Sequence, residues 1–181
     1  MKINRAFRFL ILAAVLLGTF PRAGYSQEVK YNEYQVKAAF IYNFSSFIEW
    51  PEMSPAGGAI PQELCVLGTD PMGPNLESFR GKALRGTELT VTRIGSLKTV
   101  RDCRILYVAI SEKDHLDDVI EALASSPVLT ISDIEDGARQ GVMINFYLEE
   151  EMVRFEINIE AMRRAGLNAS AKLLKLARIV R

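Results

Sequence analysis

Short β-type runs alternate with helical segments along the centre of this chain, and this alternation restricts the fold more than any other feature of the sequence. The runs are apolar or alternating and rich in β-branched residues; they cover residues 63–68, 88–94, 104–110 and 128–131. Residues 114–124 carry an apolar stripe of helical period, with Ser111 and Asp114 as a capping box before it. Strand–helix–strand order favours an α/β fold with a largely parallel sheet and helices packed on it.

The C-terminal part of the chain predicts a different pairing. Residues 142–148 and 152–157 are two β-type runs joined only by 149–151, which predicts an antiparallel hairpin. The chain then ends in two predicted helices, residues 159–165 and 170–180, separated at Gly166.

The N-terminal segment has the three parts of a secretory signal. Positive residues at 2, 5 and 8 precede an apolar run over 9–20, and the small residues Gly24 and Ser26 precede a cleavage point. This order predicts a signal peptide over 1–26 and one α/β domain over 27–181. A membrane anchor is the alternative, but the run is shorter than the roughly 20 apolar residues that a spanning helix needs.

Charge and cysteine content restrict the partners of the exported chain. The whole chain has 22 basic and 22 acidic residues, so loss of the four basic residues in 1–26 leaves a net charge of −4; this argues against nucleic acid. Cys65 and Cys103 are the only cysteines and can form one disulfide in an oxidising compartment. Two buried free thiols are the alternative. A metal site lacks further ligands, because His115 is the only histidine.

The sequence contains none of the common catalytic motifs. We find no glycine-rich phosphate loop, no zinc-protease motif and no serine-hydrolase elbow. The sequence therefore predicts no catalytic residue, no metal and no cofactor, and a protein that is not an enzyme. A small-ligand receptor is the alternative function, because ligands bind at the carboxyl ends of parallel strands. The polar residues at those predicted ends are Thr69, Asp70, Ser111 and Asp133. Turn and capping roles explain such residues better than a ligand site does.

A predicted helix over residues 31–50 has an unusually wide apolar face. Its apolar positions cover an arc of about 200°, wider than the stripe of an ordinary surface helix, and Lys37 and Asn43 lie inside this arc. We expect one edge of the helix to contact a second chain; burial of the helix on nearly all sides is the alternative. The predicted inward residues are Val36, Phe40 and Phe47, and the predicted contact residues at the edges are Ile41, Ile48 and Trp50.

The last predicted helix has a basic face. Lys172, Lys175 and Arg178 recur every three residues, and residues 161–181 contain no acidic residue. We expect this face to border the contact surface, with an acidic partner or an anionic lipid surface opposite it. Stabilisation of the helix dipole by basic residues near its C-terminus is the alternative explanation.

Five stretches taken in order resemble a known family. They are VKAAFIYNFSSFIEWP (36–51), LCVLGTDPMG (64–73), CRILYVAISE (103–112), PVLTISD (127–133) and RFEINIEAMRRAGLNASAKLLKLAR (154–178). Together they are similar to the YfiR-like periplasmic proteins. The resemblance implies a periplasmic protein with a three-layer α/β fold, a Rossmann-like sheet, dimerisation and no catalysis.

The resemblance also implies a function. A protein of this family restrains an inner-membrane diguanylate cyclase, an enzyme of cyclic-di-GMP signalling, by binding its periplasmic region, and an outer-membrane lipoprotein relieves the restraint. The family's two cysteines that flank the first and third strands match Cys65 and Cys103. A further disulfide near the hairpin has no counterpart here, because residues 142–155 contain no cysteine. Redox control through that bond is therefore not expected in this chain.

Overall fold

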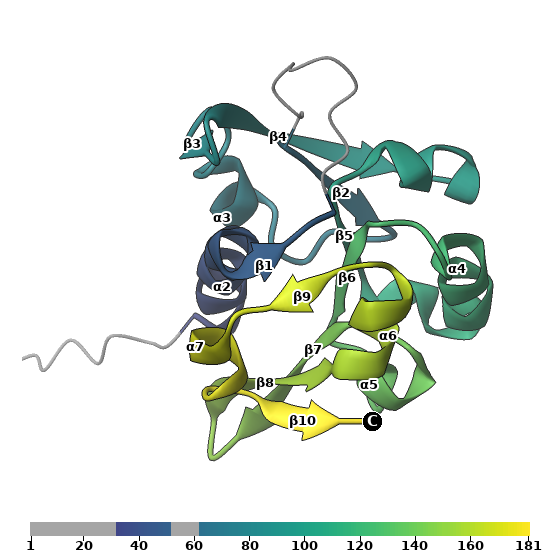
Figure 1. The fold of residues 1–181 in the computed structure, drawn as a ribbon. Coiled ribbons are helices and arrows are strands. Elements are labelled where there is room, and N and C mark those ends of the chain that lie inside the picture. Colours follow the sequence, from purple (N-terminus) through teal and green to yellow (C-terminus); the bar gives the residue numbers. More distant parts are fainter. Residues whose placement is uncertain (1–31, 52–61) are drawn as a thin grey trace, which may run out of the picture. The chain divides into compact units, whose positions relative to one another are not determined.

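The computed structural model describes residues 32–51 and 62–181 of the chain (Figure 1). The predicted signal peptide over 1–26 and residues 52–61 lie outside the described residues. Within the described part, no helix has the length and apolar character needed to cross a membrane.

The core of the fold is an eight-stranded sheet with the order β10-β8-β7-β6-β5-β2-β4-β3. Strands β4, β2, β5, β6 and β7, taken in this order across the sheet, are parallel to one another, which confirms the predicted largely parallel sheet. The strands are β2 (Gln62–Leu67), β3 (Ala83–Leu84), β4 (Thr87–Ile94), β5 (Ile105–Val108), β6 (Leu129–Ser132), β7 (Ile144–Glu149), β8 (Met152–Asn158) and β10 (Arg178–Val180). A separate antiparallel pair joins β1 (Ile48–Glu49) to β9 (Asn168–Ala169).

The predicted hairpin is confirmed. β7 and β8 are antiparallel, with Phe146 opposite Phe155. Glu150 and Glu151 between them both adopt positive φ angles, 49° and 61°. A two-residue turn of this kind matches the twist of the flanking strands.

Helices cover both faces of the sheet and produce three layers. They are α2 (Glu33–Phe47), α3 (Pro74–Glu77), α4 (Leu116–Leu123), α5 (Gly137–Gln140), α6 (Ile159–Arg164) and α7 (Ala171–Leu174), with the 3-10 helices η1 (Leu97–Asp102) and η2 (Ile110–His115). α2 and α4 lie on opposite sides of the sheet (Figure 1). Alternate residues of β5 enter two different apolar clusters: Tyr107 packs on the α2 side, and Leu106 and Val108 pack on the α4 side.

Helix α2 is shorter than the predicted helix over 31–50 and is rotated relative to the prediction. It ends at Phe47, and Ile48 belongs to β1. Ile41 and Ile48, predicted as exposed edges, are fully buried, whereas Phe47, predicted to point inward, is 37% exposed. The apolar arc is too wide to select one inward face. Two tertiary contacts select it instead: the Phe44 ring packs on the rings of Phe146 and Phe155, and Lys37 is buried in an ion pair.

The predicted C-terminal helix over 170–180 is wrong. The helix α7 ends after one turn, at Leu174, and the chain then extends as β10, which is parallel to β8. Pairing with β8 stabilises the extended form of the β-branched pair Ile179 and Val180. Lys172, Lys175 and Arg178 are exposed but do not share a helix face.

Cys65 and Cys103 form a disulfide, as the sequence predicted, with their Cα atoms 5.8 Å apart. The bond joins β2 to the residue that follows η1, and both cysteines are buried. Because it closes a loop with a sequence separation of 38, the chain-entropy model gives it at most about 4 kcal/mol.

Reduction of this disulfide is expected to lower the free energy of unfolding by about 2–4 kcal/mol. Urea unfolding curves with and without reductant measure the difference. The Cys65→Ser/Cys103→Ser variant is the control, because its curve must not respond to reductant. Two alkylatable thiols in freshly exported protein would contradict the assignment.

Candidate functional site

The carboxyl ends of the parallel strands hold the residues that the sequence singled out. At the end of β2 the Thr69 N–H donates to the Ser111 Oγ, 2.9 Å away. This contact requires Gly68, because a Cβ at that position would collide with Ser111 and Glu112. Ser111 therefore links η2 to the segment that follows β2. The predicted capping box is wrong, because no side chain caps η2 or α4.

Asp70 has the turn role that was the alternative to ligand binding in the sequence analysis. Its Oδ1 accepts the N–H groups of Met72 and Gly73 at 2.8 and 3.0 Å. Its Oδ2 accepts from Arg93 on β4 at 2.7 Å. Both carboxylate oxygens are therefore occupied by contacts that position the start of α3 against β4.

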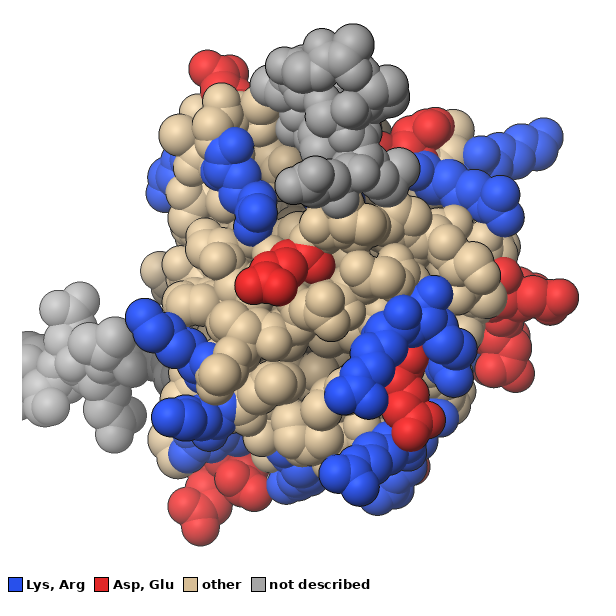
Figure 2. All heavy atoms as spheres, viewed as in Figure 1, with Lys and Arg blue, Asp and Glu red and all other residues tan. Residues whose placement is uncertain are grey.

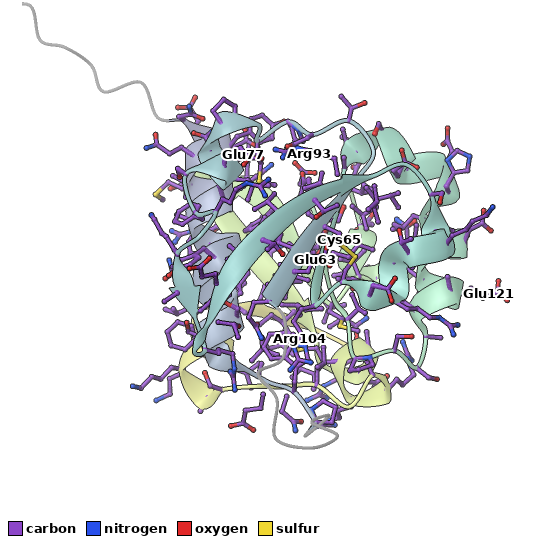
Figure 3. All side chains as sticks on the ribbon, turned by 90° about the horizontal axis from the view of Figure 1, so that it is seen from above. Glu63, Cys65, Glu77, Arg93, Arg104 and Glu121 are labelled. Atoms are coloured by element: carbon purple, nitrogen blue, oxygen red, sulfur yellow. A yellow bond between two sulfur atoms is a disulfide. The ribbon has the colours of Figure 1, made fainter. Side chains whose placement is uncertain are left out.

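An ion-pair cluster extends this contact. Arg93 also pairs with Glu77, beside which it is seen in Figure 3, and Glu77 pairs with Arg80 at 2.6 Å. The guanidinium groups of Arg80 and Arg93 lower the pKa of Glu77 to about 2. Opposite charges thus satisfy one another in this cluster, which holds α3 against β4.

Asp133, at the end of β6, is the centre of a buried polar group. Its Oδ2 lies 2.6 Å from the Lys37 Nζ, and its Oδ1 accepts from the Tyr107 hydroxyl at 2.7 Å. Glu33 approaches the same ammonium at 2.5 Å, and the Tyr34 ring lies 4.9 Å away. Lys37 is only 3% exposed.

The charges of this group are stabilised by their neighbours. Burial alone lowers the pKa of Lys37, but its hydrogen bonds with Asp133 and Glu33 more than offset this effect, so its pKa is raised. Burial, together with Asp133, raises the pKa of Tyr107. At neutral pH Lys37 is an ammonium and Tyr107 a neutral hydroxyl. The group is suited to position α2 against the sheet and to present fixed charges.

A cavity of about 540 Å³ opens next to this group. Lys37 and Asp133 line one side, and residues of the hairpin and of β10 line another. Arg178 alone of the three predicted basic residues belongs to this lining. Its guanidinium lies 4.1 Å from the centre of the Tyr147 ring and pairs with Glu149 at 3.2 Å.

The outward face of α2 forms a second, more apolar feature. A groove of about 330 Å³ is lined by Gln35, Val36, Ala39, Phe40 and Asn43. Phe47 lies one turn further along the same face. An exposed helix face is normally polar. The predicted contact residues Ile41 and Ile48 are buried and do not line this groove.

The fold and these sites define a three-layer α/β protein with a mostly parallel sheet and a cavity at the carboxyl ends of its strands. Residues 34–178 match the YfiR/HmsC-like family, and the chain belongs to this family.

Two solved structures have similar folds. A conserved domain protein from Vibrio cholerae has a TM-score of 0.54 and 10% identity; the match covers 82% of this chain and 60% of that one. The ABC domain in complex with L-Trp from Streptococcus pneumoniae has a TM-score of 0.53 and 9% identity, with 83% and 62% covered. This chain thus spans less than two thirds of either protein, and the likeness concerns the fold.

Proposed function

We propose that this chain is a periplasmic, non-catalytic regulator that binds the periplasmic region of a membrane-anchored diguanylate cyclase and restrains it. One observation carries the proposal: the match to the YfiR/HmsC-like family extends over residues 34–178. The predicted signal peptide supports export. In this proposal the partners are that enzyme, a second copy of the chain, and an outer-membrane lipoprotein that removes the regulator from the enzyme.

The outward face of α2 is the proposed contact surface for the cyclase. It presents Val36, Ala39 and Phe47, with Phe40 half-buried beside them because its ring packs on Phe146 and Phe155. Apolar and aromatic side chains are favoured at the centres of interfaces. On the neighbouring face, which carries β1 and β9, Figure 2 shows an area of mostly uncharged side chains with an acidic group in its middle and Lys and Arg side chains around it.

Changing Val36 and Phe47 together to serine is expected to weaken capture of the cyclase's periplasmic region at least 10-fold. Because Phe47 is exposed and Val36 only half-buried, the fold should survive. Co-purification with the co-expressed full-length cyclase measures capture, and cellular cyclic-di-GMP should rise towards the level of a strain that lacks the regulator.

Leu176→Ser is the matched control, since Leu176 is an apolar residue that is 73% exposed on another segment. Unchanged capture by the Val36→Ser/Phe47→Ser variant, with its thermal melting also unchanged, would place the interface elsewhere. Unchanged cyclic-di-GMP in the strain without the regulator would refute the proposed function itself.

A small-ligand receptor is the second candidate, and the cavity of about 540 Å³ beside Lys37 and Asp133 favours it. L-Trp, bound in one of the proteins of similar fold, is the first compound to titrate. A receptor would lose ligand binding when the cavity is changed and tolerate changes on α2, whereas a partner-binding protein would show the reverse.

A further inference from the structure

Arg104 is a buried cation without an acidic partner among the described residues. It immediately precedes β5, at the opposite end of the sheet from Arg93 and Glu77 (Figure 3). The side chain is only 9% exposed, and its Nε donates to no acceptor. Buried charges are normally paired, as Lys37 is with Asp133.

Arg104 instead lies against the indole of Trp50. The guanidinium carbon is 4.5 Å from the centre of the indole ring, which is a favourable cation–π distance. The Trp50 Nε1 is itself buried and without an acceptor. Two neighbouring residues thus each have a buried N–H donor whose hydrogen bond is unmade, although a buried unpaired donor costs about 1–3 kcal/mol.

A second positive charge lies at the same place. Arg85, in the turn between β3 and β4, has its guanidinium carbon 5.6 Å from the same indole ring. Its Nη1 donates to the carbonyls of Ser45 and Ile48 at 3.3 and 2.9 Å. Arg85 thereby caps the C-terminal end of α2, but neutral carbonyl groups do not neutralise its positive charge.

The pKa of Arg104 is consistent with a buried guanidinium that has another positive charge nearby. Burial, and then the charge of Arg85, lower the pKa of Arg104 to about 10. A negatively charged group in contact with Arg104 would accept its free N–H group and offset the repulsion from Arg85. Planar guanidiniums are the side chains best suited to bind the two oxygens of a carboxylate or phosphate.

We propose that Trp50, Arg85 and Arg104 form a binding site for a small oxyanion, namely a phosphate or carboxylate group. The site lies at the amino end of β5, away from the cavity at the carboxyl ends of the strands, and it is independent of the regulatory function proposed above.

Trp50 allows a direct test, because it is the only tryptophan of the chain. Titration of the full exported protein with inorganic phosphate, and separately with acetate, at constant ionic strength set by sodium chloride, should produce a saturable change in tryptophan fluorescence. Arg104→Gln should abolish the change. Arg104→Lys, which keeps the charge but loses the planar fork, should weaken binding at least 10-fold. Arg139→Gln is the matched control, because the Arg139 side chain is 73% exposed and pairs with Asp136.

Each outcome decides the proposal. Saturation by phosphate alone assigns a phosphate site, and saturation by acetate alone assigns a carboxylate site. The absence of a saturable response to either anion overturns the proposal, as does an equal response in the Arg104→Gln variant. Circular dichroism checks that this variant is folded. If it is not, Arg104→Lys replaces it in the comparison, and an unchanged affinity of that variant overturns the site.

Discussion

Replacing Asp133 with asparagine is expected to lower the free energy of unfolding by about 3 kcal/mol. The substitution keeps the size of the side chain and leaves an oxygen for the Tyr107 hydroxyl, but it removes the charge opposite Lys37. Loss of one partner of a buried ion pair costs about 3–5 kcal/mol. Glu33 remains beside the same ammonium, so the lower end of this range applies. Urea unfolding at neutral pH measures the loss.

The double variant Lys37→Met/Asp133→Asn separates charge from packing. It leaves no buried charge, and Met retains most of the volume of the Lys side chain, so it should recover at least half of the lost stability. A double variant less stable than Asp133→Asn alone would refute the argument. Because the pKa of Lys37 is raised above its ordinary 10.5, the contribution of the pair is fully present at neutral pH. The part that depends on the ammonium of Lys37 is lost as the pH rises through the folded-state pKa of Lys37.

The local sequence pattern was sufficient to predict the strands at the centre of the sheet. The β-type runs at 63–68, 88–94, 104–110 and 128–131 correspond to β2, β4, β5 and β6, because buried parallel strands are short apolar runs with flanking turn residues. The hairpin was equally clear, since only a few residues separate its strands. These features depend on residues that are close in the sequence.

The errors concern elements whose structure depends on distant residues. Residues 170–180 have helical spacing, but β8 offers a free edge to Ile179 and Val180, and extended pairing replaces the helix. Likewise, a wide apolar arc on α2 does not define one inward direction. The rings of Phe146 and Phe155, more than 90 residues away in the sequence, determine it.

The same limit applies to the sites. The turn role of Asp70 could be predicted from its immediate neighbours, whereas Asp133 and Lys37 are separated by 96 positions. The available signal was Lys37 itself, a charged residue inside an apolar arc, which indicates a buried partner. Arg104 gave no such signal, because a basic residue at the start of a strand is usually exposed.

The rotation of α2 leads to the second large expected effect. Phe44→Ala should lower the free energy of unfolding by about 3–5 kcal/mol, the usual cost of removing a buried aromatic ring. Phe44 is 1% exposed, and its ring centre lies 4.9 Å from that of Phe155 and 5.8 Å from that of Phe146. No small movement of α2 would refill the space between the helix and the hairpin.

Phe47→Ala is the matched control, because it removes the same group from the same helix at a position that is 37% exposed. This variant should lower the free energy of unfolding by less than about 1 kcal/mol, since removing a surface ring loses little buried area. Its effect should instead appear in capture of the cyclase, where the outward face of α2 is proposed to bind. Urea unfolding of the two variants compares them directly. Equal destabilisation by both would mean that the outward face of α2 is also packed within the protein, and the proposed contact surface would then have to be sought on another element.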